Sequence, residues 1–190
     1  MIIGISGMPA AGKDTVSEYL EQKEGYNHIS LSEILRGIVK AEGMEVNLEN
    51  LTKVGNLLTR EYNNHYLAQK AMQRVRRGRN TVISSIRQPG EIEYLRSRKD
   101  FYMVFVDADI KIRFERLKLR DREGDSKTLK EFRQIEKKQL DGKDGGMNLL
   151  ECKKKSDFVL TNDGTMEEFI KKIKDLVKKL NERERKKIGK

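Results

Sequence analysis

Short, continuous apolar segments alternate along the chain with segments of helical periodicity. The apolar segments expected to form strands are residues 1–6, 26–30, 80–85, 101–108 and 157–162. Strands that are apolar on both faces are typical of parallel sheets, because the crossover helices cover both faces of such a sheet. The alternation therefore predicts an α/β fold, in three α/β/α layers around a parallel five-stranded sheet.

Helices are predicted in the intervening segments, at residues 13–24, 32–42, 49–78, 91–98, 110–120, 128–140 and from Thr165 onward. The last one has the clearest apolar stripe and starts with a capping box, in which Thr165 is the N-cap and Glu168 follows three residues later. We expect one domain at 1–180 with helical insertions at 32–78 and 121–150. The basic end at 181–190 is expected to be solvated or frayed.

The composition limits the environments and partners that we expect. Charged residues make up 37% of the 190 residues, and the formal net charge is +10, which favours anionic partners. The single cysteine, Cys152, excludes an internal disulfide and fits a reducing compartment. With no apolar run of about 20 residues and no signal peptide, we expect a cytoplasmic protein that does not enter the membrane.

The segment Gly7-Met8-Pro9-Ala10-Ala11-Gly12-Lys13 has the spacing of a phosphate-binding loop. It follows a predicted strand and opens a predicted helix, which is the context that this motif requires. Small residues let backbone N–H groups close around a phosphate, while the helix dipole and the Lys13 ammonium add positive charge. The alternative is an ordinary strand–helix turn that happens to contain two glycines.

The residue after Lys13 is Asp14, and the hydroxyl of the usual motif stands one residue later, at Thr15. This form, "GMPAAGKDT", resembles the loop of adenylate kinase and its relatives. The likeness extends over nearly the whole chain, and is strongest to archaeal adenylate-kinase-related proteins and dephospho-coenzyme A kinases. It implies a P-loop kinase of the nucleoside monophosphate kinase superfamily that uses ATP and Mg²⁺.

The resemblance also assigns arginines to the two substrates. "HISLSEILR" resembles the monophosphate-binding segment of these kinases, and Arg36 stands at its acceptor-phosphate position. "VISSIRQPGEIEYL" resembles their third strand and the following loop, where Arg87 matches a second arginine on the same phosphate. Arg60 falls in the 32–78 insertion, where related kinases read the acceptor base, although helix packing is the default role for a residue there.

"RFERLKLRDREGD" resembles the helix that leads into the lid of these kinases. Arg116 and Arg120 are four residues apart and share a helix face, in the place of arginines that contact ATP and the transferring phosphoryl group. We place a short lid at 121–128, with Arg122 as a further candidate. Solvent exposure is the alternative for Arg120 and Arg122.

One position departs from the related kinases. Many of them carry Asp-Gly at the end of the third strand, where this chain has Ser84-Ser85. Magnesium support could then come from Asp14 or Asp107, with Thr15 nearby, while the alternative for Asp14 is a favourable interaction with the helix dipole. His28, His65 and Cys152 form no metal-binding or nucleophilic pattern.

The leading functional expectation is phosphoryl transfer from ATP to a nucleoside or deoxynucleoside monophosphate by a monomer or homodimer. Lys13, Arg87, Arg116 and Arg120 would act in catalysis, because cations stabilise the charge that spreads over the transferring phosphoryl oxygens. A second enzyme hypothesis changes the acceptor to dephospho-coenzyme A or another phosphorylated metabolite. A third is a nucleotide switch or nucleic-acid-associated ATPase, but the dispersed basic residues argue against a nucleic-acid partner.

Overall fold

The computed structural model describes residues 1–120, 126–140 and 147–188 of the chain. Its strands are β1 (Ile2–Gly7), β2 (Asn27–Ser30), β3 (Thr81–Ser84), β4 (Phe101–Asp107) and β5 (Phe158–Thr161). They form one parallel sheet in the order β2-β3-β1-β4-β5, with Ile2 aligned to both Thr81 and Phe101. The predicted fold class is confirmed.

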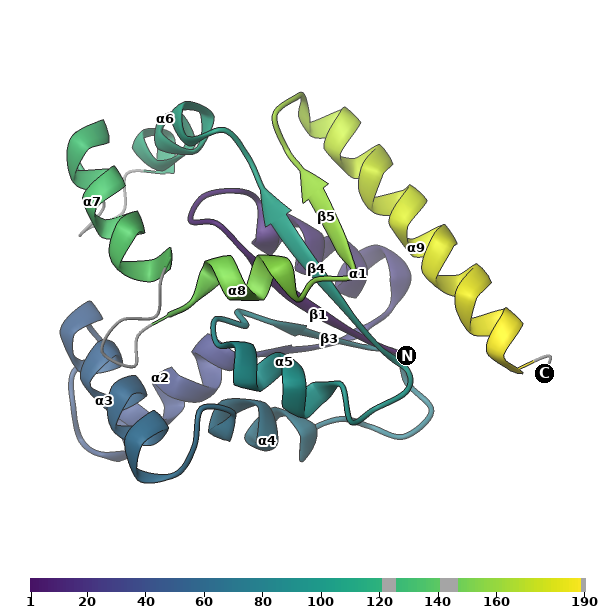
Figure 1. Cartoon of the computed structure of the whole chain (residues 1–190), viewed down its shortest axis with the longest axis horizontal. Coiled ribbons are helices and arrows are strands. Elements are labelled where there is room, and N and C mark those ends of the chain that lie inside the picture. The colour runs from purple at the N-terminus through teal and green to yellow at the C-terminus, as the bar shows by residue number, and fades with distance from the viewer. Residues whose placement is uncertain (121–125, 141–146, 189–190) are drawn as a thin grey trace.

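Helices lie on both faces of this sheet. They are α1 (Lys13–Glu24), α2 (Leu31–Ala41), α3 (Leu48–Glu61), α4 (Tyr66–Met72), α5 (Pro89–Leu95), α6 (Ile110–Arg120), α7 (Leu129–Leu140), α8 (Leu149–Lys154) and α9 (Met166–Ile188). In Figure 1, α5 and α8 lie in front of the strands, α1 lies behind them, and α9 runs beside the edge strand β5. The central strands β1 and β4 are almost entirely buried, as a two-sided cover requires.

Two helices replace the single one predicted at 49–78. After α3 the chain turns at residues 62–65, where the Asn63 side chain accepts a hydrogen bond from the backbone N–H of His65 at 3.0 Å. The short amide side chain satisfies the backbone outside a helix, which favours a break there. α4 then ends at Met72, and Gly78 takes a left-handed φ of 75° in the turn before β3.

Helix α8 was not predicted. Its N-cap is Asn148, whose side-chain oxygen accepts a hydrogen bond from the Glu151 N–H at 3.1 Å. The sequence Asn-x-x-Glu is a capping pattern that could have revealed the helix. The cap also ties α8 to the third strand's loop, because the Asn148 N–H donates to the Arg87 carbonyl at 2.9 Å.

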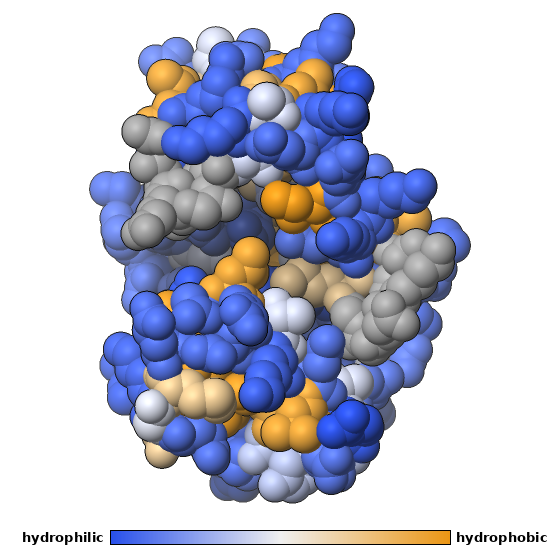
Figure 2. Space-filling view, turned by 90° about the vertical axis from the view of Figure 1, so that its left-hand side faces the viewer, coloured by the Kyte–Doolittle hydropathy of each residue, from blue (hydrophilic) through white to orange (hydrophobic). Residues whose placement is uncertain are grey.

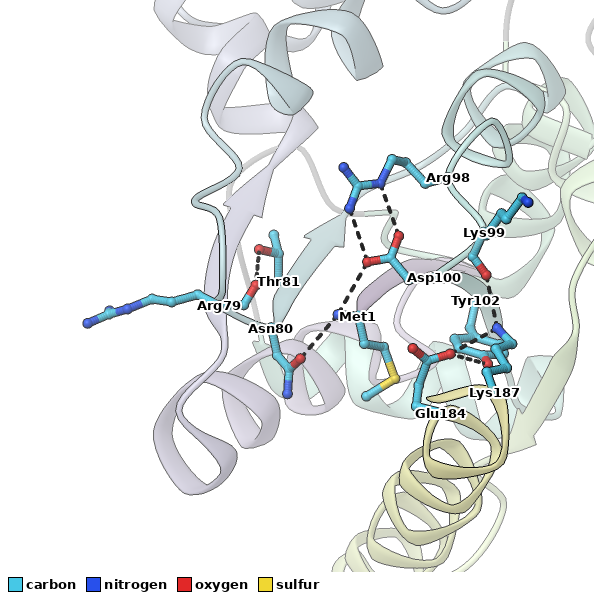
Figure 3. Close-up of polar contacts among 10 residues, drawn as sticks. All are labelled: Met1, Arg79, Asn80, Thr81, Arg98, Lys99, Asp100, Tyr102, Glu184 and Lys187. Carbon is cyan, nitrogen blue, oxygen red and sulfur yellow. Dashed lines mark hydrogen bonds and ion pairs between the residues drawn. The ribbon is translucent and has the colours of Figure 1, made fainter. Parts of the chain in front are cut away.

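The basic end of the chain is exposed, as expected of a solvated end, and α9 continues through it to residue 188. Figure 3 shows its last turns beside the beginning of β4. Tyr102 donates a hydrogen bond to Glu184 at 2.6 Å, and the Lys187 ammonium donates to the Lys99 carbonyl at 2.9 Å. At the start of α9, the Thr165–Glu168 capping box forms as predicted.

No helix of the described ranges is long and apolar enough to cross a membrane. The predicted lid at 121–128 and the candidate Arg122 lie largely outside the described residues, because the description resumes only at residue 126.

Candidate active site

The loop between β1 and α1 forms a tight, hydrogen-bonded turn. The Met8 N–H donates to the Val106 carbonyl at 3.0 Å, and the Ala11 N–H donates to the Met8 carbonyl at 3.1 Å. Ala10 and Gly12 both adopt left-handed backbone angles, with φ of 59° and 97°. Turns that combine such residues leave successive N–H groups pointing into a concave anion site.

Glycine is required at both fixed positions of the loop. A Cβ at Gly7 would stand 2.5 Å from the Val106 carbonyl oxygen, and one at Gly12 would stand 2.6 Å from Nδ2 of Asn162. Real Cβ atoms do not approach other atoms so closely. The spacing in the sequence therefore reflects a packed backbone turn.

We expect Gly12→Ala to lower the free energy of unfolding by about 1–3 kcal/mol, because it adds a clash to an unfavourable φ. Gly37→Ala is the matched control. Gly37 lies inside α2, where an added Cβ would meet nothing within 4 Å, so alanine there should stabilise by about 0.5–1 kcal/mol. Urea unfolding of both variants measures this, and equal effects of the two changes would contradict the requirement.

Helix α1 begins at Lys13, as predicted, and its first turn carries Lys13, Asp14 and Thr15. The Lys13 ammonium lies 3.8 Å from the Asp14 carboxylate, and the Asp14 side chain is 66% exposed. Thr15 is half-buried. The positive helix terminus and the ammonium thus face the same turn, which is the arrangement that binds a phosphate.

The opposite, carbonyl side of the loop is held by β5 and α6. Asn162, buried at the end of β5, donates from Nδ2 to the Ala11 carbonyl at 2.9 Å and accepts from Nη2 of Arg116 at 3.3 Å. The other terminal nitrogen of Arg116, Nη1, is buried and has no hydrogen-bond partner in the described part of the chain. A buried guanidinium donor without a partner is costly, so this atom marks a place for an acceptor oxygen.

Arg36 and Arg87 meet at the carboxyl ends of β2 and β3. Burial lowers the pKa of Arg87, the nearby Arg36 charge lowers it further, and Glu91 and Asp14 counteract the shift. Arg36 is held by Glu33, whose carboxylate lies 2.6 Å from Nη1. Arg87 therefore lies within electrostatic reach of both Arg36 and Asp14 in the first turn of α1, at the sheet edge where parallel α/β folds bind ligands.

Ser84 and Ser85 point to different neighbours. Ser84 Oγ lies 2.8 Å from Nε2 of His28, on the β2 side. Ser85 has a left-handed φ of 64°, and its hydroxyl donates to Ser32 at 3.4 Å. Left-handed angles cost energy at serine and are concentrated at functional sites. Ser85, unlike Ser84, also lines the cavity that opens beside the two arginines.

Glu91 is the buried carboxylate beneath this edge. Its Oε2 accepts hydrogen bonds from the backbone N–H groups of Arg87 at 2.8 Å and Gln88 at 3.0 Å. Burial raises the pKa of Glu91 to about 7, against the effect of these bonds and of the Arg87 charge. These two hydrogen bonds hold the backbone at Arg87 and Gln88, and so fix the position from which the Arg87 side chain extends towards the site.

This raised pKa predicts a pH dependence of stability. The folded protein holds the Glu91 proton more tightly than the unfolded chain does, so the free energy of unfolding should fall by about 3 kcal/mol as the pH rises from about 4.5 to about 7. Above pH 7 this contribution is constant. Urea titrations of Glu91→Gln should lack the fall, whereas Glu93→Gln, exposed on the same helix, should keep it. Parallel profiles for wild type and Glu91→Gln would contradict the assignment.

A cavity of about 540 Å³ opens beside Arg36 and Arg87. Figure 2 shows a hollow on this side of the molecule, with hydrophobic surface on both of its sides. The apolar residues that line the cavity come from α2, α3, α4 and α7 and from the segment before α8: Leu31, Leu35, Leu48, Leu51, Leu58, Tyr66, Leu67, Ile135 and Met147. Its size suits a small organic ligand, and its two arginines suit an anionic end on that ligand.

Several polar side chains of this cavity are already hydrogen-bonded within the protein. The Thr52 and Thr59 hydroxyls donate to carbonyls of their own helix, at 2.8 and 3.1 Å, and the Asn63 side chain closes the turn after α3. The walls therefore offer mainly apolar contact, and the cations among the described lining residues are Arg36, Arg87 and Lys138.

The remaining predicted residues fall in different places. Arg60 does not line the cavity: its guanidinium pairs with Glu61 at 3.3 Å and its side chain is 76% exposed. Arg120 lies exposed at the end of α6. Asp107 ends β4, but its carboxylate pairs with the Lys153 ammonium at 2.6 Å.

Asp107 is thus committed to an ion pair, whereas the exposed Asp14 carboxylate and the Thr15 hydroxyl keep oxygen atoms at the loop. Mg²⁺ binds proteins through one or two such oxygens, with phosphates and water completing its shell. These residues therefore fit a magnesium ion carried by a nucleotide. The described residues contain no group of three or more metal-ligating side chains.

Sequence reasoning missed three buried side chains of this site: Arg113, Glu136 and Asn162. Arg113 donates to the Pro9 carbonyl of the loop at 3.3 Å, and Glu136 pairs with it from α7. Arg113 stands three residues before Arg116, on the face that the helical period directs inward. Its place on that face was the sequence signal that could have identified Arg113 as a site residue.

Comparison with known proteins places the chain among relatives of similar length. A profile of the AAA domain family matches residues 3–140. A UPF0200 protein of Thermococcus gammatolerans is 33% identical over 187 residues, covering 95% of each chain. One from Methanothermobacter thermautotrophicus is 30% identical, covering 96% of this chain and 92% of the relative.

Among solved structures, shikimate kinase from Bacteroides thetaiotaomicron superposes with a TM-score of 0.63 at 18% identity, over 95% of this chain and 98% of that one. A gluconokinase from Sinorhizobium meliloti gives 0.56 at 15% identity, over 95% of each chain. At these identities the likeness is one of fold, and it covers nearly the whole molecule.

Proposed function

This chain belongs to the AAA domain family and to the archaeal UPF0200 proteins, and has a P-loop kinase fold; from this we propose that it transfers the γ-phosphoryl group of ATP to a nucleoside or deoxynucleoside monophosphate. The observation that carries the proposal is the convergence of Lys13, Arg36 and Arg87 on one sheet edge beside a cavity. That arrangement offers one place for the donor phosphates and another for an acceptor that carries a phosphate.

On the donor side, residues 7–15 bind the phosphates of ATP. The loop N–H groups hold the β-phosphate, and Lys13 neutralises charge on the β- and γ-phosphates. Arg116 and Arg120 contact ATP and the transferring group from α6, and the buried, unpartnered Nη1 of Arg116 supports this role. Asp14 and Thr15 would hold a Mg²⁺ ion carried by the nucleotide, and that ion would supply neutralisation of the charge that develops on the phosphates.

On the acceptor side, Arg36 and Arg87 bind the phosphate of the monophosphate. Guanidinium groups suit this task because they stay charged and bind phosphate through two parallel hydrogen bonds. The leucines of the cavity wall suit a flat base, which binds largely through apolar contact. We propose the 32–78 insertion as the acceptor-binding part and 121–128 as the lid, within a single cytoplasmic domain.

The reaction needs positioning more than covalent chemistry. Phosphoryl transfer passes through a loose transition state, so the chain's tasks are to bring the two phosphates into line, to supply cations and to exclude water. Lys13 and the four arginines provide the positive charge. The half-buried position of Arg87 increases its effect, because burial weakens competition from water.

A labelled-ATP assay tests the proposal. Purified protein, Mg²⁺ and γ-labelled ATP are incubated with ribo- and deoxynucleoside monophosphates, dephospho-coenzyme A, shikimate and gluconate in separate reactions. We expect label on one or more monophosphates. Label on dephospho-coenzyme A, shikimate or gluconate alone would contradict the proposed acceptor. Hydrolysis of ATP that only RNA stimulates would replace the proposal with a nucleic-acid-associated ATPase.

A further inference from the structure

Arg113 is a buried cation that the roles above do not use. It is 3% exposed, and its Nε donates to the Ala108 carbonyl at 2.8 Å. Its Nη1 donates to the Pro9 carbonyl at 3.3 Å and pairs closely with the Glu136 carboxylate. The guanidinium also lies over the Phe132 ring, 5.6 Å from the centroid. The side chain therefore joins the end of β4, the phosphate loop and α7.

The contact with Pro9 bears directly on the phosphate site. A loop whose N–H groups face a phosphate turns carbonyl groups outward, and a carbonyl that leaves water needs a donor. Arg113 supplies that donor to Pro9, as Asn162 does to Ala11. Ala10, between them, packs against the small apolar cluster of α6 and α7. The outer side of the loop is thus fixed by side chains.

Glu136 connects this contact with the acceptor cavity. It lies on α7 and is 7% exposed, whereas Ile135, Lys138 and Gln139 of the same helix line the cavity. One helix therefore has one side against the acceptor cavity and another tied, through Arg113, to the phosphate loop. A shift of α7 relative to the loop would move a wall of the cavity away from the donor phosphates.

We propose that Arg113 and Glu136 are a positioning pair that sets the acceptor cavity in register with the phosphate loop. This inference rests on the proposed function, since it assigns α7 to the acceptor side of the same reaction. A buried ion pair contributes little net stability, because desolvation offsets the attraction between the charges. Its specific effect here is geometric: the pair fixes one orientation of α7 against the Pro9 carbonyl.

The decisive variant removes the pair without leaving a buried charge. Arg113→Met combined with Glu136→Leu fills the space with apolar groups, which proteins often tolerate at a buried ion pair. We expect the variant to stay folded with a lowered Tm, because the Pro9 and Ala108 carbonyls lose their donor, and it is assayed below that Tm. Its kcat for transfer from MgATP, to whichever nucleoside monophosphate the wild type uses best, should fall by about tenfold or more, because alignment is lost. KM for the monophosphate should change by less than about threefold, since Arg36 and Arg87 remain.

Single substitutions protect the test against a folding failure. Arg113→Lys keeps a donor and the charge, so it should retain part of the wild-type kcat. Glu136→Gln removes the charge that orients Arg113, so its kcat should fall as in the double variant. Each variant is assayed below its own Tm. Glu115→Gln, an exposed ion-pair carboxylate on α6, and Lys137→Gln, exposed beside Glu136, are controls expected to keep wild-type kcat. Wild-type kcat in the double variant, or in Glu136→Gln, would overturn the inference.

Calorimetric titration with MgATP separates this inference from the proposed function. If the wild-type protein labels no acceptor, the proposed function fails, but the contact at the Pro9 carbonyl can still be tested by binding. The double variant should then bind MgATP about fivefold more weakly, because the loop is no longer fixed. Unchanged MgATP affinity in the double variant would also overturn the inference that Arg113 fixes the phosphate loop.

Discussion

Lys13→Ala is expected to lower the rate of phosphoryl transfer by about 10²–10³-fold, the usual loss when one preorganised group that stabilises the transition state is removed. The ammonium lies at the start of α1, where it adds a full charge to the partial charge of the helix terminus. No other lysine stands in the loop or in the first turn of α1. Transfer from labelled ATP, measured at saturating acceptor, gives the effect on kcat.

Lys23→Ala is the matched control for Lys13→Ala. Lys23 lies exposed in the last turn of the same helix, far from the loop, so its loss should leave kcat within about twofold of wild type. Urea unfolding of both variants checks that each is folded. Full activity in a folded Lys13→Ala protein would show that the phosphate loop takes no part in phosphoryl transfer.

Arg87→Gln is expected to lower kcat/KM for the acceptor by about 10²-fold with little change in KM for ATP. Arg87 contacts the acceptor phosphate in this account, and its burial limits how far water can replace the lost charge. Steady-state kinetics with each substrate varied in turn give the two KM values. Arg87→Lys should restore only part of the loss, because an ammonium lacks the planar pair of donors.

Arg76→Gln is the control for the Arg87 substitutions. Arg76 is an exposed arginine in the turn between α4 and β3, outside the residues that line the cavity, and its loss should leave both KM values unchanged. An equal rise in KM for ATP and for the acceptor in Arg87→Gln would contradict an acceptor-specific role. It would indicate that the whole site had shifted.

The local parts of this site could be predicted from the sequence because neighbouring residues determine them. The spacing of Gly7, Gly12 and Lys13 predicts the loop, and the structure starts α1 at Lys13. Continuous apolar runs predict buried parallel strands, and the structure has five of them in one parallel sheet. The capping box at Thr165 likewise depends on residues only three positions apart.

The tertiary parts of the site could not be predicted in the same way. Arg113 and Glu136 are 23 residues apart, and Arg113 and Pro9 are 104 apart, so no local period reports their contacts. Arg60 illustrates the converse. Its position in the sequence suggested the acceptor site, but side-chain direction on α3 places it at the surface, and such directions depend on how the helix packs.

The break between α3 and α4 has a similar cause. The apolar pattern continues across residues 62–65, but the Asn63 side chain offers the backbone an alternative hydrogen bond. Helical periodicity alone does not report whether such a side-chain hydrogen bond will replace the helical one. The contacts at the end of α9 could not be predicted either: the segment is charged and exposed, and Glu184 and Lys187 reach Tyr102 and the Lys99 carbonyl, more than 80 residues away in the sequence.

The most direct test of the central claim is phosphorus NMR of the product formed from ATP and the preferred acceptor. Transfer to a phosphate held by Arg36 and Arg87 predicts a new phosphoanhydride, seen as two coupled phosphorus signals from the acceptor. A single uncoupled phosphate-ester signal would show that the acceptor atom is a hydroxyl group. Inorganic phosphate as the sole product would show that no acceptor is phosphorylated, and either result would contradict the account.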